Sequence, residues 1–221
     1  MESFKLHNAS VGFGKNEVLK EVSFSLETEE ILGIFGKNGC GKSTLLKMIF
    51  GTLHKGKLNA SINGELYKPS KNIAEGKIAY LPQHSFLPKN IKVRDLIPIY
   101  FSGEKEQDTI FYDALIAKIT NKKVGELSIG QVRYFEVLLI GNLGHPFLMM
   151  DEPFSMVEPL YKLKIQALLQ KLKVKKGIII TDHYYRDVLS ITTKNILIKD
   201  GVGHSIKNVE DLQSLAYLGE N

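Results

Sequence analysis

Short apolar runs alternate with longer amphipathic stretches along this chain, and the alternation predicts strands followed by helices. The runs of strand length are residues 4–9, 22–26, 31–35, 78–81, 147–150, 178–181 and 196–199. Helical spacing is found in residues 42–50, 131–141, 160–173 and 209–217. Several of the runs are apolar along their whole length, as is typical of parallel strands buried on both faces. The pattern predicts an α/β protein with a mostly parallel sheet between helices.

Three further segments give the predicted organisation its detail. Gly12 and Gly14 indicate a loop between the first two strands, and residues 58–67 predict a hairpin that turns at Asn63-Gly64. Residues 92–121 lean helical but carry polar patches, which favours a subdomain inserted on the surface. In the predicted helix 160–173, the apolar positions 160, 163, 167, 168 and 172 fall on one stripe, which we expect to be buried.

The segment GKNGCGKST, residues 36–44, joins the apolar strand 31–35 to the helix 42–50. Gly36-x-x-x-x-Gly41-Lys42-Ser43 is the phosphate-loop pattern, in which backbone N–H groups and a helix N-terminus hold the phosphates of a nucleotide. Lys42 would reach the terminal phosphates and count among the catalytic residues, and the Ser43 hydroxyl would ligate Mg²⁺. The predicted nucleotide contacts of the loop are Gly36, Asn38, Gly39, Cys40, Gly41, Lys42, Ser43 and Thr44. The chain is therefore predicted to bind ATP or GTP.

Two other predicted strands end in polar residues that suit phosphate chemistry. Asp151 and Glu152 follow the run 147–150, and Asp182-His183 follows 178–181. The carboxyl ends of parallel strands meet at the edge where the phosphate loop opens. Asp151 would hold Mg²⁺ through water, and Glu152 would accept a proton from an attacking water. We expect His183 at the same edge.

Composition and charge narrow the class of protein. The 221 residues are 43% hydrophobic and 24% charged, enough for one large domain, or one domain plus a subdomain, with a core. No apolar run approaches the roughly 20 residues of a membrane helix, and no secretory signal is visible. The single cysteine, Cys40, excludes an internal disulfide and fits a reducing cytoplasm. The net charge is +5, but only three of the 29 basic residues are arginine, so we expect no nucleic-acid partner.

The ordered motifs resemble those of ABC-type ATPases. Residues 126–131, ELSIGQ, are similar to the family's signature Leu-Ser-Gly-Gly-Gln, and Gln83 in YLPQ to its Q-loop glutamine. His183 resembles its switch histidine, and Phe13 the aromatic residue that stacks on adenine. The resemblance implies a P-loop NTPase of ABC type, with an N-terminal antiparallel β subdomain. It also implies one domain over residues 1–221, a helical subdomain at 84–127 and a signature helix at 128–143.

The same resemblance implies a mechanism and partners. The chain would bind and hydrolyse ATP with Mg²⁺ as a homodimer, or paired with another ABC ATPase subunit. Ser128, Gly130 and Gln131 of one copy would contact the nucleotide held by the other, and Gln83 would sense the γ-phosphate and ligate Mg²⁺. A separate transmembrane permease would dock on the helical subdomain, which places the chain peripherally on the cytoplasmic face of the inner membrane.

Three short strings indicate a subfamily. DEPFSMVEP at 151–159, TDHYYRDVL at 181–189 and YLGE at 217–220 look like the lipopolysaccharide-export and branched-chain amino acid import ATPases. Ile129 replaces the first signature glycine, and Glu158 stands where an aspartate is usual. A soluble ABC-type ATPase acting on ribosomes or DNA is one alternative. A regulatory subunit that binds ATP but barely hydrolyses it is another.

Overall fold

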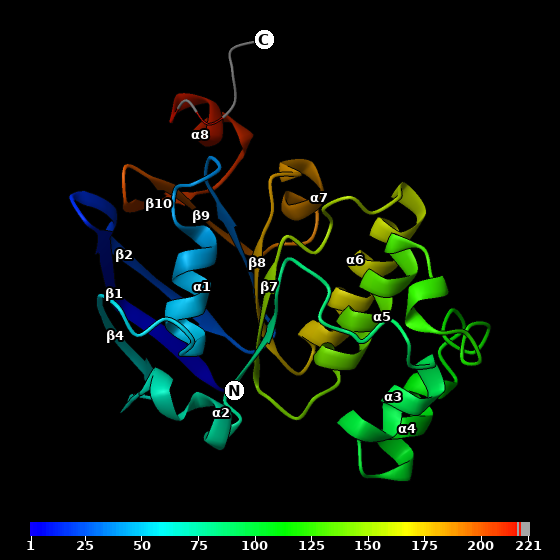
Figure 1. Cartoon of the computed structure of the whole chain (residues 1–221). Helices are drawn as coiled ribbons and strands as arrows, with labels where there is room; N and C mark the ends of the chain where they lie inside the picture. Colours follow the sequence, from blue (N-terminus) through cyan, green and yellow to red (C-terminus); the bar gives the residue numbers. More distant parts are fainter. Residues whose placement is uncertain (216, 218–221) are drawn as a thin grey trace.

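The strands of the computed structural model, which describes residues 1–215 and 217, form one ten-stranded sheet in the order β5-β4-β1-β2-β10-β9-β3-β8-β7-β6 (Figure 1). Their bounds are β1 Ser3–Phe13, β2 Asn16–Glu27, β3 Ile31–Phe35, β4 Lys57–Ile62, β5 Glu65–Leu66, β6 Ile78–Leu81, β7 Phe147–Asp151, β8 Gly177–Thr181, β9 Lys194–Lys199 and β10 Val202–Ile206. β9, β3, β8, β7 and β6 pair in parallel, whereas β1, β2, β4 and β5 pair antiparallel. The predicted α/β class with an N-terminal antiparallel part is confirmed.

Helices cover both faces of the parallel strands. Their bounds are α1 Lys42–Phe50, α2 Asn72–Glu75, α3 Val93–Tyr100, α4 Glu104–Phe111, α5 Ile129–Gly141, α6 Pro159–Lys173, α7 Tyr185–Leu189 and α8 Val209–Ser214. Figure 1 shows α1 on one side of β7 and β8, with α5 and α6 on the other. Among the described residues, no helix is long and apolar enough to cross a membrane.

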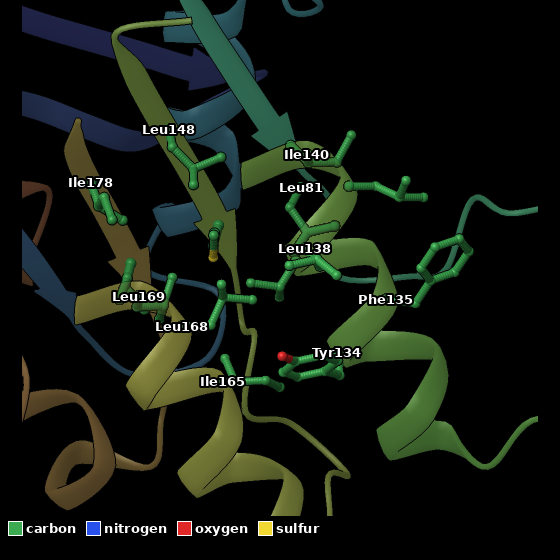
Figure 2. Close-up of a cluster of buried hydrophobic side chains, with 14 of the residues drawn as sticks. Leu81, Tyr134, Phe135, Leu138, Ile140, Leu148, Ile165, Leu168, Leu169 and Ile178 are labelled. Atoms are coloured by element: carbon green, nitrogen blue, oxygen red, sulfur yellow. The ribbon is translucent and has the colours of Figure 1, made fainter. Parts of the chain in front are cut away.

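Two clusters of buried side chains stabilise this layered arrangement. One contains Leu45 and Ile49 of α1 together with Leu6 of β1 and Ile34 of β3. The other lies between the parallel strands and the pair α5 and α6. Figure 2 shows part of it, including Leu138, Leu148, Ile165, Leu168, Leu169 and Ile178. Burying an aliphatic side chain of this size contributes about 1.5–3 kcal/mol, so these clusters hold the strand ends at fixed positions.

Two local predictions are wrong. β1 and β2 extend beyond residues 4–9 and 22–26, so that Gly12 lies within β1 and the turn is at Gly14-Lys15. β1 pairs with β2 through several register shifts, so polar residues beyond the apolar runs also belong to the two strands. The apolar runs alone do not predict this extension. In α6, Leu160 and Leu163 are 64% exposed, whereas the predicted Leu168 is buried together with Ile165 and Leu169, which the predicted stripe left out. Both stripes obey helical spacing and share Leu168, and packing against α5 decides which of the other positions are buried.

The segment between β6 and α5 carries α3 and α4, which lie beyond α5 in Figure 1. A bridge between Lys92 and Lys123 brings the two ends of this segment together. Its buried Leu96 and Ile110 belong to the same cluster as α5. The boundaries 84–127 and 128–143, and the extent of the domain over 1–221, stay predictions. Of the string YLGE, Tyr217 lies within the described residues, and positions 218–220 lie outside them.

Candidate functional site

The phosphate-loop segment connects β3 to α1, as its glycine spacing predicts. Gly39 and Gly41 have φ values of 83° and 105°, in the left-handed region that favours glycine. A Cβ on Gly41 would also lie 2.8 Å from side-chain atoms of Val18 and Leu19. Lys42 is buried and donates to the Gly36 carbonyl over 2.6 Å, which folds the lysine across its own loop. The loop is thus curled in front of the N-terminus of α1, with the Lys42 side chain folded back across it.

A cavity of about 420 Å³ opens in front of this loop. Its lining comes from the loop, from the segment after β6 and from the ends of β7 and β8. The lining residues are Asn38, Gly39, Gly41, Lys42, Ser43, Thr44, Gln83, Glu152, Ser155 and His183. The structure therefore brings together nine residues predicted from the sequence, and adds Ser155. The roles assigned to them stay predictions.

Glu152, Gln83 and His183 converge on the far wall of the cavity. The parallel register places Asp151 of β7 beside Thr181 of β8, so the residues that follow each strand share one edge of the sheet. Gln83 Nε2 donates to Glu152 Oε2 over 2.9 Å, and His183 Nδ1 lies 3.5 Å from the same oxygen. The Glu152 backbone adopts φ 50° and donates its N–H to the Thr181 carbonyl over 2.7 Å. This unusual backbone conformation directs a carboxylate toward the phosphate loop.

Asp151 lies behind Glu152 and is buried. Its two carboxylate oxygens accept hydrogen bonds from Thr181 Oγ1 at 2.7 Å and from the Tyr80 hydroxyl at 3.2 Å. Burial and the neighbouring Asp151 charge raise the pKa of Tyr80, which therefore stays a hydrogen-bond donor. Neither Thr181 nor Tyr80 was identified from the sequence, because each looks like an ordinary strand residue.

The oxygen donors near the loop fit Mg²⁺. Those that line the cavity are the Ser43 hydroxyl, the Gln83 amide oxygen and the Glu152 carboxylate. Asp151, predicted to hold Mg²⁺ through water, lies outside the lining, and its carboxylate is buried against Thr181 and Tyr80. Within the described residues, no group of three or more His, Cys, Asp or Glu side chains could enclose a metal ion. Mg²⁺ is usually held by one or two carboxylates together with water and substrate phosphates, so the sparse donor set suits it.

The predicted signature residues do not line the cavity. Ser128 caps α5: its Oγ accepts the Gln131 N–H at 3.2 Å, and Gln131 Oε1 accepts the Ser128 N–H at 3.0 Å. Gly130 packs against Glu158 and Tyr161, where an added Cβ would lie 2.2 Å from Glu158 Oε2. Within one chain these residues stabilise the start of α5, while the Ser128 hydroxyl keeps its proton for another acceptor.

Three further predicted contacts also lie outside the lining. Phe13 ends β1, is 42% exposed, and has Lys55 Nζ 4.9 Å from its ring centre. Gly36 and Cys40 lie at the back of the loop, where Cys40 lines a separate cavity of about 190 Å³ with Tyr217. Burial raises the pKa of the Cys40 thiol.

Sequence reasoning missed a buried ion pair in α5. Arg133 and Glu136 are 5% and 1% exposed, and Arg133 Nη1 lies 3.3 Å from Glu136 Oε2. Burial lowers the pKa of Arg133, and the Glu136 carboxylate opposes this shift. The available signal was two opposite charges, three positions apart, in an otherwise apolar helix.

Comparison with known proteins agrees with this geometry. The sequence profile of a family described as "ABC transporter" matches residues 19–155. The lipopolysaccharide export system ATP-binding protein LptB of Haemophilus influenzae is 26% identical over 240 residues, which cover 100% of this chain and 98% of that protein. A probable ABC transporter ATP-binding protein of Azorhizobium caulinodans is 28% identical over 225 residues, covering 94% of this chain and 80% of that protein.

Solved structures share the fold. A nucleotide-free ATP-binding cassette from an ABC transporter superposes with a TM-score of 0.81 at 21% identity, covering 100% of both chains. The ADP conformation of MJ1267, an ATP-binding cassette of an ABC transporter, gives a TM-score of 0.82 at 22% identity and covers 97% of this chain and 94% of that one.

Proposed function

This chain belongs to the ABC transporter family as an ATP-binding subunit and ATPase, and from that premise we propose that it hydrolyses ATP as half of a nucleotide-sandwich dimer that drives a separate permease. One observation carries the catalytic part of the proposal. Gln83, Glu152 and His183 meet at one carboxylate oxygen, across a single cavity from the phosphate loop.

The residues around the cavity have different roles in hydrolysis. The loop's N–H groups and Lys42 hold the phosphates, and Lys42 stabilises charge that develops on the terminal one. The Glu152 carboxylate accepts the proton of the attacking water, and its contact with Gln83 fixes its direction. His183 approaches Glu152 from the β8 side, where it can contact the terminal phosphate. Mg²⁺, bound by Ser43 and Gln83 and through water by Asp151, would neutralise phosphate charge.

The dimer part of the proposal rests on what the cavity lacks. Ser128 and Gly130 lie at the start of α5, outside its lining, so a single chain surrounds a nucleotide on one side only. A second copy that presents its own Ser128 hydroxyl and α5 N-terminus would supply the missing side. The adenine ring would stack on Phe13, whose ring is partly exposed.

The transport part of the proposal comes from similarity to relatives. The matching relatives are ATP-binding proteins of export systems and ABC transporters, and the Haemophilus influenzae protein is covered almost completely. We assign the segment 84–127 as the part that docks a membrane-spanning permease, with the chain on the cytoplasmic face of the inner membrane. Lipopolysaccharide appears in the name of the Haemophilus influenzae relative only. The substrate that this chain helps to transport is determined by the permease that binds it.

A regulatory subunit with slow turnover is the second candidate, favoured by Ile129. This isoleucine is 56% exposed at the first position of α5, beside Ser128, where the family usually has glycine.

Phosphate release by the full chain with and without Mg²⁺ tests hydrolysis. Lys42→Met should abolish release, because among the described residues Lys42 is the only lysine or arginine that lines the cavity. Lys47→Met is the matched control, because Lys47 lies on the same helix but is exposed and outside the cavity. Equal loss of activity in both variants would contradict the site, and strong ATP binding without release would favour the regulatory candidate.

A further inference from the structure

The buried ion pair of α5 contacts both walls of the catalytic site. On one side, Arg133 Nη1 donates to the Pro82 carbonyl over 2.8 Å, and Glu136 Oε1 accepts the Phe86 N–H at 3.2 Å. These two bonds hold the backbone before and after Gln83. The ion pair therefore fixes the loop that carries the glutamine from both of its ends.

On the other side, the same guanidinium reaches the end of β7. Arg133 Nη2 donates to the Asp151 carbonyl over 2.7 Å and to the Glu152 carbonyl over 3.2 Å. The forked geometry of arginine allows one side chain to bond Pro82 and Asp151 at once, which a lysine cannot reproduce. The side chains of Gln83 and Glu152 are hydrogen-bonded to each other on the cavity side. The backbone segments that carry them are also connected through the buried Arg133 guanidinium.

Stability alone does not explain such a pair. Taking two charges out of water is costly, and replacing a buried pair by apolar residues is often neutral or stabilising. What apolar residues could not supply is a set of directed hydrogen bonds to three carbonyls and one N–H. The bonded groups belong to the two segments whose relative position decides where the Glu152 carboxylate points.

We infer that Arg133 and Glu136 are positioning residues that hold Gln83 and Glu152 in register for hydrolysis and tie both to the signature helix. The inference rests on the proposed function. Ser128 is five residues before Arg133 on the same helix, a rise of about 7.5 Å. A shift of α5 when Ser128 meets a nucleotide on a second copy would therefore move the carbonyl anchors of both catalytic segments.

Arg133→Lys in the full chain tests the inference. It keeps the charge and removes the fork, so we expect kcat for ATP to fall roughly 10- to 100-fold, as for a small misplacement of reacting groups. The Kd for ATP should stay within about twofold, because the phosphate loop makes no contact with Arg133 among the described residues. Arg94→Lys is the matched control: Arg94 is exposed, bonds Asn121, and lies outside the cavity, so both constants should stay unchanged.

A second variant guards against a folding defect. Arg133→Met combined with Glu136→Leu removes both charges together and leaves neither unpaired, so the chain should fold and still lose kcat with Kd retained. Wild-type kcat in Arg133→Lys, or a parallel loss of kcat, ATP affinity and melting temperature in both variants, would overturn the inference. A wild-type chain that neither binds nor hydrolyses ATP would instead contradict the proposed function itself.

Discussion

Replacing Ile129 by glycine should tighten the nucleotide-driven dimer at little cost to the single chain. Ile129 is the first residue of α5 and is 56% exposed, so it packs into no core and its removal opens no cavity. Less than half of a side chain worth about 1.5–3 kcal/mol on full burial is hidden, which limits the packing loss to roughly 1 kcal/mol. Glycine adds about 0.5 kcal/mol of helix-propensity cost. The melting temperature should fall by less than about 6 °C for a chain of this size.

Ile129→Gly should increase the affinity of two copies of the chain for each other. In the proposed sandwich, each Ile129 faces a nucleotide held by the other chain, and crowding at a packed contact typically costs about 1–3 kcal/mol. Relief of roughly 1 kcal/mol at each of two equivalent contacts would lower the dimer Kd about 30-fold. Turnover should rise with dimer occupancy, while the single-chain affinity for ATP stays the same.

Analytical ultracentrifugation with ATP and Mg²⁺, together with phosphate release, measures these effects. Ile73→Gly is the control, because Ile73 is also an exposed isoleucine near the start of a short helix but lies outside the cavity. An unchanged dimer Kd and kcat in Ile129→Gly would refute crowding by Ile129. An equal effect of Ile73→Gly would refute the claim that the effect arises from the position of Ile129 at the contact between the two copies.

Two further predictions concern stability and thiol chemistry. Glu158 is the N-cap of α6 but its side chain makes no capping bond, so Glu158→Asp should raise the free energy of unfolding by about 0.5–1 kcal/mol. Asn208 does cap its helix, so Asn208→Ala should lower the free energy of unfolding by about 1 kcal/mol. A lower melting temperature for Glu158→Asp would contradict this prediction. Because burial raises the pKa of Cys40, maleimide should label the native chain more slowly than the denatured chain near pH 7. The labelling rate of the native chain should increase as the pH rises and the thiolate forms. Equal labelling rates of the native and denatured chains at pH 7 would show that the thiol is not shielded.

The parts of this molecule that the sequence predicts are those fixed by local geometry. Fully buried parallel strands leave continuous apolar runs, which is why β3, β7 and β8 were located within a residue or two. The hairpin turn is predicted because Asn63 and Gly64 adopt positive φ values of 53° and 82°, a geometry that few other pairs tolerate. The phosphate loop is likewise specified by its own glycines.

The remainder depends on contacts between distant segments. Nothing in the periodicity of α6 distinguishes the exposed Leu160 from the buried Leu168, because only α5 and the sheet select the face. Arg133 and Glu136 have the spacing of a surface ion pair, and they are buried only because β7 and the segment after β6 close over them. Thr181 contacts Asp151 through strand register, which a single sequence does not contain.

The oligomeric state of Glu152→Gln with ATP and Mg²⁺ tests the central claim most directly. Glutamine keeps the size of the side chain and a hydrogen-bonding oxygen toward Gln83, but it cannot accept the proton of the attacking water. Size exclusion with light scattering should show a stable dimer that holds ATP, with phosphate release reduced to background, whereas wild-type chain returns to monomers as ATP is consumed. A Glu152→Gln chain that stays monomeric with ATP, or that releases phosphate at the wild-type rate, would contradict the claim that Glu152 hydrolyses ATP within a two-copy sandwich.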